Sequence, residues 1–391
     1  IVLGLMLRLG TSPKFTSWAF FLLVAFFTVL TGFTYLTGYV PNDVNFFEFS
    51  KWGNYVETNM KVTDCGCFGD FIKLKPKVSF FKDVFLLFPA VLFLFTQGQF
   101  HQLGSKGMRG LLSMVATVSI FIYCLSNYVW DLPHADFRPF RNGVDVAAQR
   151  QIEEDAMACV KVTGYNMTNK ETGELVTISM EDYLKNYKQY PKEAWELEQI
   201  RSKPPIEPSK ISEFAVEHGT EGYDMTSEIL QAKGYAFMIV AVDLKAEEGA
   251  PIISTRRDTT FALDTLAVGD TTELVRRVVA VKEVPIQEAT YNWGEKYTQR
   301  WTDVVNPAMQ AAKQADIPVY AVTKYLPPEK IKSFQTTTSS DYPFHKADDI
   351  LLKTIIRSNP GVVLWKDGTI VQKWHHSKLP DFNTIQAEYL K

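Results

Sequence analysis

Two cysteines separated by one glycine are the residues of this chain best suited to chemistry. They are Cys65 and Cys67, in the run Asp64-Cys65-Gly66-Cys67-Phe68. Two thiols at this spacing can close into a small strained disulfide ring, because glycine adopts the unusual backbone angles that the ring needs. Strain raises the reduction potential, so such a disulfide exchanges readily with other thiols. The pair therefore predicts thiol–disulfide exchange, with Cys65 and Cys67 as the catalytic residues.

Two other interpretations of the pair remain open. One is a tight structural turn whose cysteines pair elsewhere or do nothing. The other is a metal site, which needs more than two ligands, and the loop offers no histidine. We therefore predict no metal. The adjacent His375 and His376 are expected at the surface, on opposite sides of a strand end, where they do not form a metal site either.

Cys124 and Cys159 are the other two cysteines, and four are too few for a disulfide-stapled fold. Cys124 lies about six residues before the end of the apolar stretch 110–130, which at about 1.5 Å per residue is on the order of 9 Å inside a membrane surface. There it is a candidate relay thiol for the pair, or a small buried hydrophobic residue. Cys159 is isolated, and we expect it to pack in a strand.

Three stretches are long and apolar enough to form membrane-spanning helices. They are residues 15–42, 84–105 and 110–130, and none contains Asp, Glu, Lys or Arg; about 20 apolar residues are needed to cross the hydrocarbon core. Three crossings put the N-terminal end and the soluble C-terminal part on opposite sides of the membrane. The cysteine loop 41–79 lies between the first and second crossings, so it shares a side with residues 132–391. The opening ten residues are typical of the last turns of a span, so we expect an N-terminally truncated sequence.

Composition divides the chain into a membrane part and a soluble part. The 391 residues carry 41 Lys and Arg against 44 Asp and Glu, a net charge of −3, which excludes the dominant basic surface of a nucleic-acid-binding protein. Nearly all long apolar runs fall within the first third of the chain. We predict a transmembrane helical domain over residues 1–131, a juxtamembrane linker with a small hairpin over 132–209, and an α/β domain over 210–391 with an insertion at 246–293.

The order of elements in the last part predicts a mixed α/β domain. The apolar runs 235–243 and 317–323 are typical of buried central strands, and Asp367-Gly368 is a strong hairpin signal. The remaining expected elements are a strand at 211–216, a helical turn at 226–230, helices at 301–315, 350–356 and 381–390, strands at 362–365 and 369–374, and an added hairpin inside the insertion.

The Asp-Cys-Gly-Cys-Phe-Gly run between two spans resembles the DoxX/MauE group of redox-associated membrane proteins. More narrowly, residues 352–374 are typical of the Bacteroidetes members that carry a thioredoxin-like C-terminal domain. The resemblance covers most of the chain apart from an insertion near 250–295. It implies a DoxX-like bundle of four helices, of which three complete spans are visible here. It further implies a multi-pass protein of the bacterial inner membrane, embedded in the lipid bilayer, with its C-terminal domain in the periplasm.

A thioredoxin-like fold has further implications for the soluble domain. That fold places a cis-proline beside its active site, at a position matched by Pro360. The resemblance therefore points to Phe68, Asn359 and Pro360 as partner-binding residues. The chain departs from the fold's pattern after the strand 235–243, where thioredoxins place Cys-x-x-Cys. Since residues 160–391 contain no cysteine, this domain cannot exchange disulfides by itself.

The leading prediction is an inner-membrane thiol–disulfide redox protein. Cys65 and Cys67 exchange electrons with a periplasmic thiol or disulfide protein, and a quinone is the candidate cofactor and electron acceptor. The rival prediction is a non-catalytic membrane-anchored binding or scaffold protein with a degenerate thioredoxin-like domain, which the missing Cys-x-x-Cys favours. A hydrolase is less favoured, because neither Gly-x-Ser-x-Gly nor His-Glu-x-x-His occurs in the chain.

Overall fold

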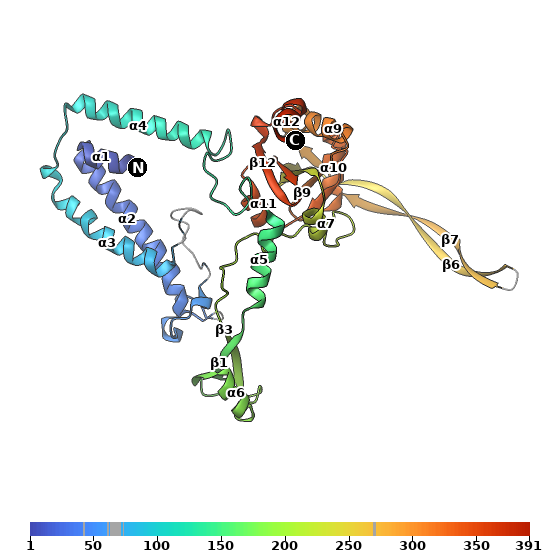
Figure 1. Cartoon of the computed structure of the whole chain (residues 1–391), viewed down its shortest axis with the longest axis horizontal. Helices are drawn as coiled ribbons and strands as arrows, with labels where there is room; N and C mark the ends of the chain where they lie inside the picture. Colours follow the sequence, from blue (N-terminus) through green and yellow to red (C-terminus); the bar gives the residue numbers. More distant parts are fainter. Residues whose placement is uncertain (42–43, 61, 63–71, 73, 269–270) are drawn as a thin grey trace. The chain divides into compact units, whose positions relative to one another are not determined.

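The computed structural model describes residues 1–391 except 42–43, 61, 63–71, 73 and 269–270. The chain divides into two compact units, residues 1–138 and 139–391. The first unit is helical and the second is a mixed α/β unit (Figure 1). The predicted three-part division of the chain stays a prediction.

Unit 1 is built from one short and three long helices. The short helix is α1 (Val2–Leu9), and the long ones are α2 (Pro13–Leu36), α3 (Pro76–Phe95) and α4 (Lys106–Ser126). All three long helices are long and apolar enough to cross a membrane, which confirms the predicted number of spans. The second of them, however, spans Pro76–Phe95 rather than the predicted 84–105. It begins at a proline, which is favoured in the first helical turn, and it ends at Phe95 before the 3-10 turn η5. Short 3-10 turns connect them, namely η1 (Thr37–Tyr39), η2 (Phe49–Lys51), η3 (Glu57–Asn59) and η5 (Gln97–Gln99).

A buried polar contact and a close backbone approach hold α2 against α3. The Thr31 hydroxyl donates a hydrogen bond to the Asp83 carboxylate at 3.0 Å, and both side chains are buried. One residue further along α2, a Cβ at Gly32 would lie 2.9 Å from the Phe80 ring, so only glycine fits there. Apolar helices associate through such small-residue contacts and interhelical hydrogen bonds, because burial of apolar surface supplies no driving force between helices in lipid.

Unit 2 is centred on a five-stranded sheet of order β10-β9-β4-β11-β12. β10, β9 and β4 are parallel, whereas β11 is antiparallel to both β4 and β12. β4 is buried from Phe237 to Ala241, as its unbroken apolar run predicts. The turn at Asp367 and Gly368 has positive φ at both residues, which is the hairpin geometry that this dipeptide favours. The strands are β4 (Tyr235–Ala241), β9 (Val319–Thr323), β10 (Phe344–Lys346), β11 (Gly361–Lys366) and β12 (Thr369–His375).

Helices and aromatic side chains complete the core of unit 2. The Phe334 ring lies 4.9 Å from that of Trp293 and 5.0 Å from that of Trp301, and it also contacts Phe344. Phe334 and Trp301 are fully buried. The helices of the unit are α5 (Val146–Ala158), α6 (Met180–Asn186), η6 (Tyr187–Gln189), α7 (Thr226–Gln231), α8 (Glu295–Gln299), the π-helical η7 (Arg300–Val305), α9 (Asn306–Gln314), α10 (Pro328–Thr338), α11 (Asp349–Ile355), η8 (His376–Lys378) and α12 (Phe382–Tyr389).

Two smaller β structures confirm both predicted hairpins. β1 (Val162–Asn169) pairs with β2 (Leu175–Ser179) and with β3 (Trp195–Arg201) in a separate sheet. Within the insertion, β6 (Ile252–Val268) and β7 (Thr271–Glu288) form a long antiparallel hairpin that extends from the rest of the unit (Figure 1). A short ladder at its base joins β5 (Ala246–Glu248) to β8 (Tyr291–Trp293).

Two local predictions are wrong. Residues 211–216 form turns rather than a strand. Their apolar side chains are buried because Phe214 packs against Phe140 and Trp365, and the preceding turn is anchored by the carboxylate of Glu153, which accepts from Ser209 N at 2.9 Å. Cys159 lies in no strand; it follows the last turn of α5 and its side chain is exposed.

The aromatic cluster provides a test of the core. Phe334→Ala should lower the free energy of unfolding of unit 2 by about 3–5 kcal/mol, because it removes a fully buried ring and leaves a cavity. Denaturant unfolding of the full chain in detergent, followed by tryptophan fluorescence, measures the effect. Phe261→Ala, in the exposed part of the hairpin, is the matched control and should change stability by less than about 0.5 kcal/mol. Equal effects of the two substitutions would contradict the assigned core.

Candidate functional site

The predicted catalytic pair lies in a segment that the structure describes only at its two ends. Cys65, Cys67 and Phe68 are outside the described residues. An ion pair of 2.7 Å between Glu57 in η3 and Lys75 before α3 closes the base of this segment. Both side chains are more than half exposed, so the pair stabilises the closed loop only weakly. Glu57 and Lys75, which flank this segment in the sequence, therefore lie next to one another.

A group of aromatic side chains lies where this loop begins and ends. The Tyr35 ring is 5.8 Å from that of Tyr39 and 5.5 Å from that of Tyr55, and it stacks on Phe80 of α3. The hydroxyls of Tyr35 and Tyr39 are 3.1 Å apart and hydrogen-bonded. Tyr55 donates to the sulfur of Met60, the last described residue before residue 61. This arrangement offers flat apolar rings with phenol donors next to the loop.

Cys124 lies in the last turn of α4, which ends at Ser126. Its thiol is free and its side chain is exposed on the helix. The relay role stays a prediction, since the cysteine pair that it would serve lies outside the described residues.

In unit 2 the predicted partner-binding residues lie where three segments meet. The Asn359–Pro360 peptide bond is cis and immediately precedes β11, which confirms the position of the cis-proline. The Asn359 side-chain amide donates to the carbonyl of Asp243 after β4 at 2.8 Å. The Tyr297 hydroxyl donates to that same carbonyl at 2.9 Å, and Arg300 donates to the carbonyl of Asn359 at 2.8 Å. We call this set the cis-proline junction.

The electrostatics of the cis-proline junction favour binding over catalysis. Burial raises the pKa of the Tyr297 phenol, which stays protonated as a donor. The carboxylate of Asp243 forms an ion pair of 3.1 Å with Lys324. Pro360 is buried and Asn359 is half-buried. The polar groups of Asn359 thus bond within the unit.

His376 adds a second polar contact at the same place. Its ring Nδ1 lies 3.2 Å from the Ser358 hydroxyl, and its backbone N–H donates to that hydroxyl at 3.2 Å. Ser358 in turn donates to the carbonyl of Pro360. The serine proton is thus directed at a backbone carbonyl of its own loop, so this Ser–His pair holds the loop and does not form an activated nucleophile.

The expectation for the two histidines is wrong. His375 is buried, and its ring centroid lies 4.1 Å from that of His376. Side chains alternate only while a strand continues, and here β12 ends at His375 and the chain turns into η8. Nδ1 of His375 accepts from the Ser377 backbone N–H at 3.2 Å, and so caps that turn. Among the described residues, no three His, Cys, Asp or Glu side chains cluster as metal ligands.

Sequence reasoning missed most of this junction. Asp243, Tyr297, Arg300 and Ser358 belong to no motif, because they meet only through the fold. The one local signal is the Ser-Asn-Pro run before a strand. It predicts a loop there, but not which distant side chains contact that loop.

Comparisons with known proteins add little to this geometry. No family model matches the chain, and no curated protein matches it. Among solved structures, the chain is similar to a solution structure of a proposed protein disulfide isomerase from Bacteroides thetaiotaomicron. The two share 16% identity with a TM-score of 0.26, over 45% of this chain and 85% of that one. A likeness at that TM-score supports no conclusion about activity.

The histidine of the junction predicts an acid-sensitive fold. Burial, and after it His375 and Arg300, lower the pKa of His376 to about 4, whereas an unfolded histidine titrates near 6.5. Between these values the unfolded chain binds a proton that the folded chain does not, so stability falls as the pH falls from about 6.5 to 4. Because His376 is partly exposed, we expect it to lower the free energy of unfolding by about 1–2 kcal/mol over this pH range.

Denaturant unfolding of the full chain at several pH values measures this loss. His376→Gln should remove part of the pH dependence in that window, and His134→Gln, an exposed histidine of unit 1, should leave it unchanged. His345, whose pKa burial and His218 also lower to about 4, contributes equally in the wild type and in both variants. Parallel stability curves for the wild type and His376→Gln would contradict the assigned role.

Proposed function

We propose that the chain is a thiol–disulfide redox protein of the bacterial inner membrane, with Cys65 and Cys67 as its exchanging pair. The observation that carries this proposal is the Cys-Gly-Cys run between α2 and α3, two helices long enough to span a membrane. In this proposal α3 and α4 each cross the membrane once, so that run lies on the same side as residues 139–391. The polar α/β unit then faces the periplasm together with the cysteine loop.

The proposed exchange is balanced in two steps. A thiolate of a reduced periplasmic partner attacks the Cys65–Cys67 disulfide and forms a mixed disulfide, releasing the other cysteine as a thiolate. The partner's second thiolate then attacks the mixed disulfide, which leaves an oxidised partner and a reduced pair. A membrane quinone, held near Tyr35, Tyr39 and Tyr55, would supply the acceptor for the two electrons and two protons that leave when the two thiols return to the disulfide. The tyrosine cluster next to the loop supports this choice, since flat aromatic rings with phenol donors suit a quinone ring.

The finer family assignment belongs to the same proposal. Residues 1–131 are a DoxX/MauE-type bundle, and residues 210–391 are a thioredoxin-like domain. The sheet order of unit 2, its two antiparallel C-terminal strands and the cis-proline before β11 support the second part. In this proposal the domain binds the partner at the cis-proline junction, where Asn359 and Pro360 are the predicted contact residues, and Phe68 is the predicted contact residue in the cysteine loop.

A second candidate function is a membrane-anchored binding or scaffold protein without redox activity. One specific observation favours it: where a thioredoxin-like domain would carry its cysteines, this chain has Asp243, paired with Lys324 at 3.1 Å. The carbonyl of Asp243 is also bound by two side chains of the junction. This end of the sheet thus holds its own loops together and carries no thiol, which suits the binding of a partner rather than redox chemistry.

The redox state of Cys65 and Cys67 in growing cells decides between the two functions. Acid quenching, sequential alkylation with two tags and mass spectrometry read it before and after a mild reductant pulse. We expect a mixed population that re-oxidises within minutes, and Cys65→Ser or Cys67→Ser should trap a mixed disulfide with the partner. Cys124→Ser and Cys159→Ser serve as controls; the second should have no effect, and the first should slow re-oxidation only if Cys124 is a relay. A disulfide that never changes, or two thiols inert to oxidant, would support the scaffold instead.

The proposed topology is testable independently of the chemistry. In a background without the other cysteines, the exposed Cys159 of unit 2 should react with a membrane-impermeant maleimide from the periplasmic side. A cysteine in place of Gln99, exposed in η5 between α3 and α4, should react only after the inner membrane is opened. In the proposed topology α4 crosses the membrane once between these two positions. Labelling of both positions from the same side would contradict that topology.

A further inference from the structure

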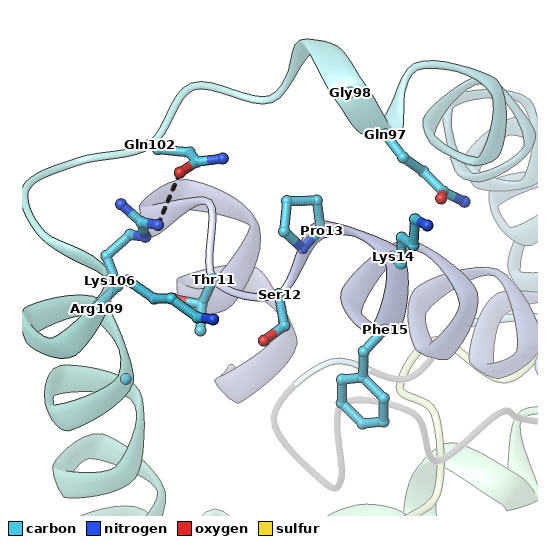
Figure 2. A pocket seen from close by; sticks show the side chains of 11 residues that line it. Thr11, Ser12, Pro13, Lys14, Phe15, Gln97, Gly98, Gln102, Lys106 and Arg109 are labelled. Carbon is cyan, nitrogen blue, oxygen red and sulfur yellow. Dashed lines mark hydrogen bonds between the residues drawn. The ribbon is translucent and has the colours of Figure 1, made fainter.

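The end of the helical unit opposite the cysteine loop contains a cavity with a cationic lining. Its volume is about 710 Å³, within the range of small-molecule sites. It lies where α2 begins, where α3 continues into η5, and where α4 begins. The described residues that line it include Lys14, Lys106 and Arg109, and no acidic side chain is among them. Figure 2 shows these side chains around the opening.

Arg109 is the strongest indication of an anionic ligand. Only 7% of the residue is exposed, and its guanidinium donates to the side-chain oxygen of Gln102 and to the carbonyl of Gly104, each at 2.8 Å (Figure 2 draws the first). These bonds use two of the five guanidinium N–H donors and hold the group at the cavity wall. No acidic side chain of the described residues pairs with it. A buried charge without a counter-ion is costly, so the site favours an anion that supplies one.

The start of α2 adds backbone donors on the opposite wall. Ser12 precedes the helix, and its side chain makes no capping hydrogen bond within the described structure. The first N–H groups of a helix lack partners within the helix and favour negative charge. Lys14 belongs to this first turn, and its side chain and that of Gln97 in η5 both line the cavity (Figure 2). Backbone donors, a fixed guanidinium and two lysines are the groups that bind phosphate.

Hydrogen bonds between segments hold this lining together. Leu103 N–H donates to the carbonyl of Leu9 at 3.2 Å, so the loop before α4 lies against the end of α1. The hydroxyls of Thr11 and Ser113 are 3.1 Å apart and join the start of α2 to α4. The cavity is thus part of the folded unit rather than a gap between separate helices.

The position of the cavity identifies the source of the phosphate. It lies at the ends of three membrane-length helices, where lipid headgroups are found. Phe15 lines it and is 64% exposed, and Leu111 on α4 is 57% exposed, so apolar side chains flank the basic groups on the side of the hydrocarbon. We propose that this cavity binds the phosphate of an anionic phospholipid, with Arg109, Lys106 and Lys14 as its ligands. The proposal does not depend on the cysteine chemistry.

Lipid binding to the purified full chain tests the proposal. After delipidation in mild detergent, phosphatidylglycerol and phosphatidylcholine with the same acyl chains are titrated, and bound lipid is counted by native mass spectrometry. We expect preferential retention of phosphatidylglycerol. Lys14→Gln and Lys106→Gln should each weaken it about fivefold, and together about 25-fold, as expected for one cation each near a headgroup. Neither lysine bonds to another described side chain, so the fold should be unaffected.

Two controls make the outcome decisive. Lys77→Gln with Lys188→Gln removes the same charge from exposed positions outside the cavity and should leave retention unchanged. Inorganic phosphate, added as a competitor, should displace phosphatidylglycerol only at much higher concentration than the lipid itself. Equal retention of the two lipids, or full retention by the Lys14/Lys106 double variant, would overturn the site. Displacement by phosphate at equal concentration would overturn the lipid as its source.

Discussion

The lengths of α2, α3 and α4 constrain most of what this protein can do. A helix that crosses the hydrocarbon core satisfies its backbone internally and exposes apolar side chains, so polar chemistry is confined to the helix ends and the loops. In unit 1 the polar groups follow that rule. The Glu57–Lys75 pair and the cysteine loop lie at one end of the helices, and Lys14, Lys106 and Arg109 lie at the other. The buried contact of Thr31 with Asp83 is the exception that holds α2 to α3.

In unit 2 the corresponding constraint is that residues 160–391 contain no cysteine. Asp243, at the end of the central strand, binds Lys324 through its carboxylate, and its backbone carbonyl accepts from Tyr297 and Asn359. These contacts join the end of β4 to the loop before β11. A rigid junction without a nucleophile can position a partner but cannot exchange electrons with it. Because this stretch of the chain contains no cysteine, the sheet of unit 2 cannot exchange disulfides by itself.

The errors of the sequence-based predictions have a common cause. The apolar residues Ile211, Phe214 and Val216 suggested a short strand. They are buried as predicted, yet Glu153 accepts from the backbone N–H groups of Ser209 and Ser212 and holds the start of this segment in a turn. His375 and His376 were assigned opposite faces because a strand alternates, yet the strand ends between them. In both cases the prediction used only the local residue pattern. The backbone path was decided by hydrogen bonds that this pattern does not contain.

The elements that could be predicted from the sequence are those whose signal is local and strong. These are the three apolar helices, the buried strand β4, the Asp367-Gly368 hairpin and the hairpin of the insertion. Each depends on the apolar content or turn chemistry of neighbouring residues, which can be read without knowing the fold. The tertiary structure alone decided which distant side chains meet. Tyr297 and Arg300 reach Asn359 across about 60 residues of sequence, and Arg109 is left facing a basic cavity. Such sites are invisible in the sequence, because only packing brings their members within bonding distance.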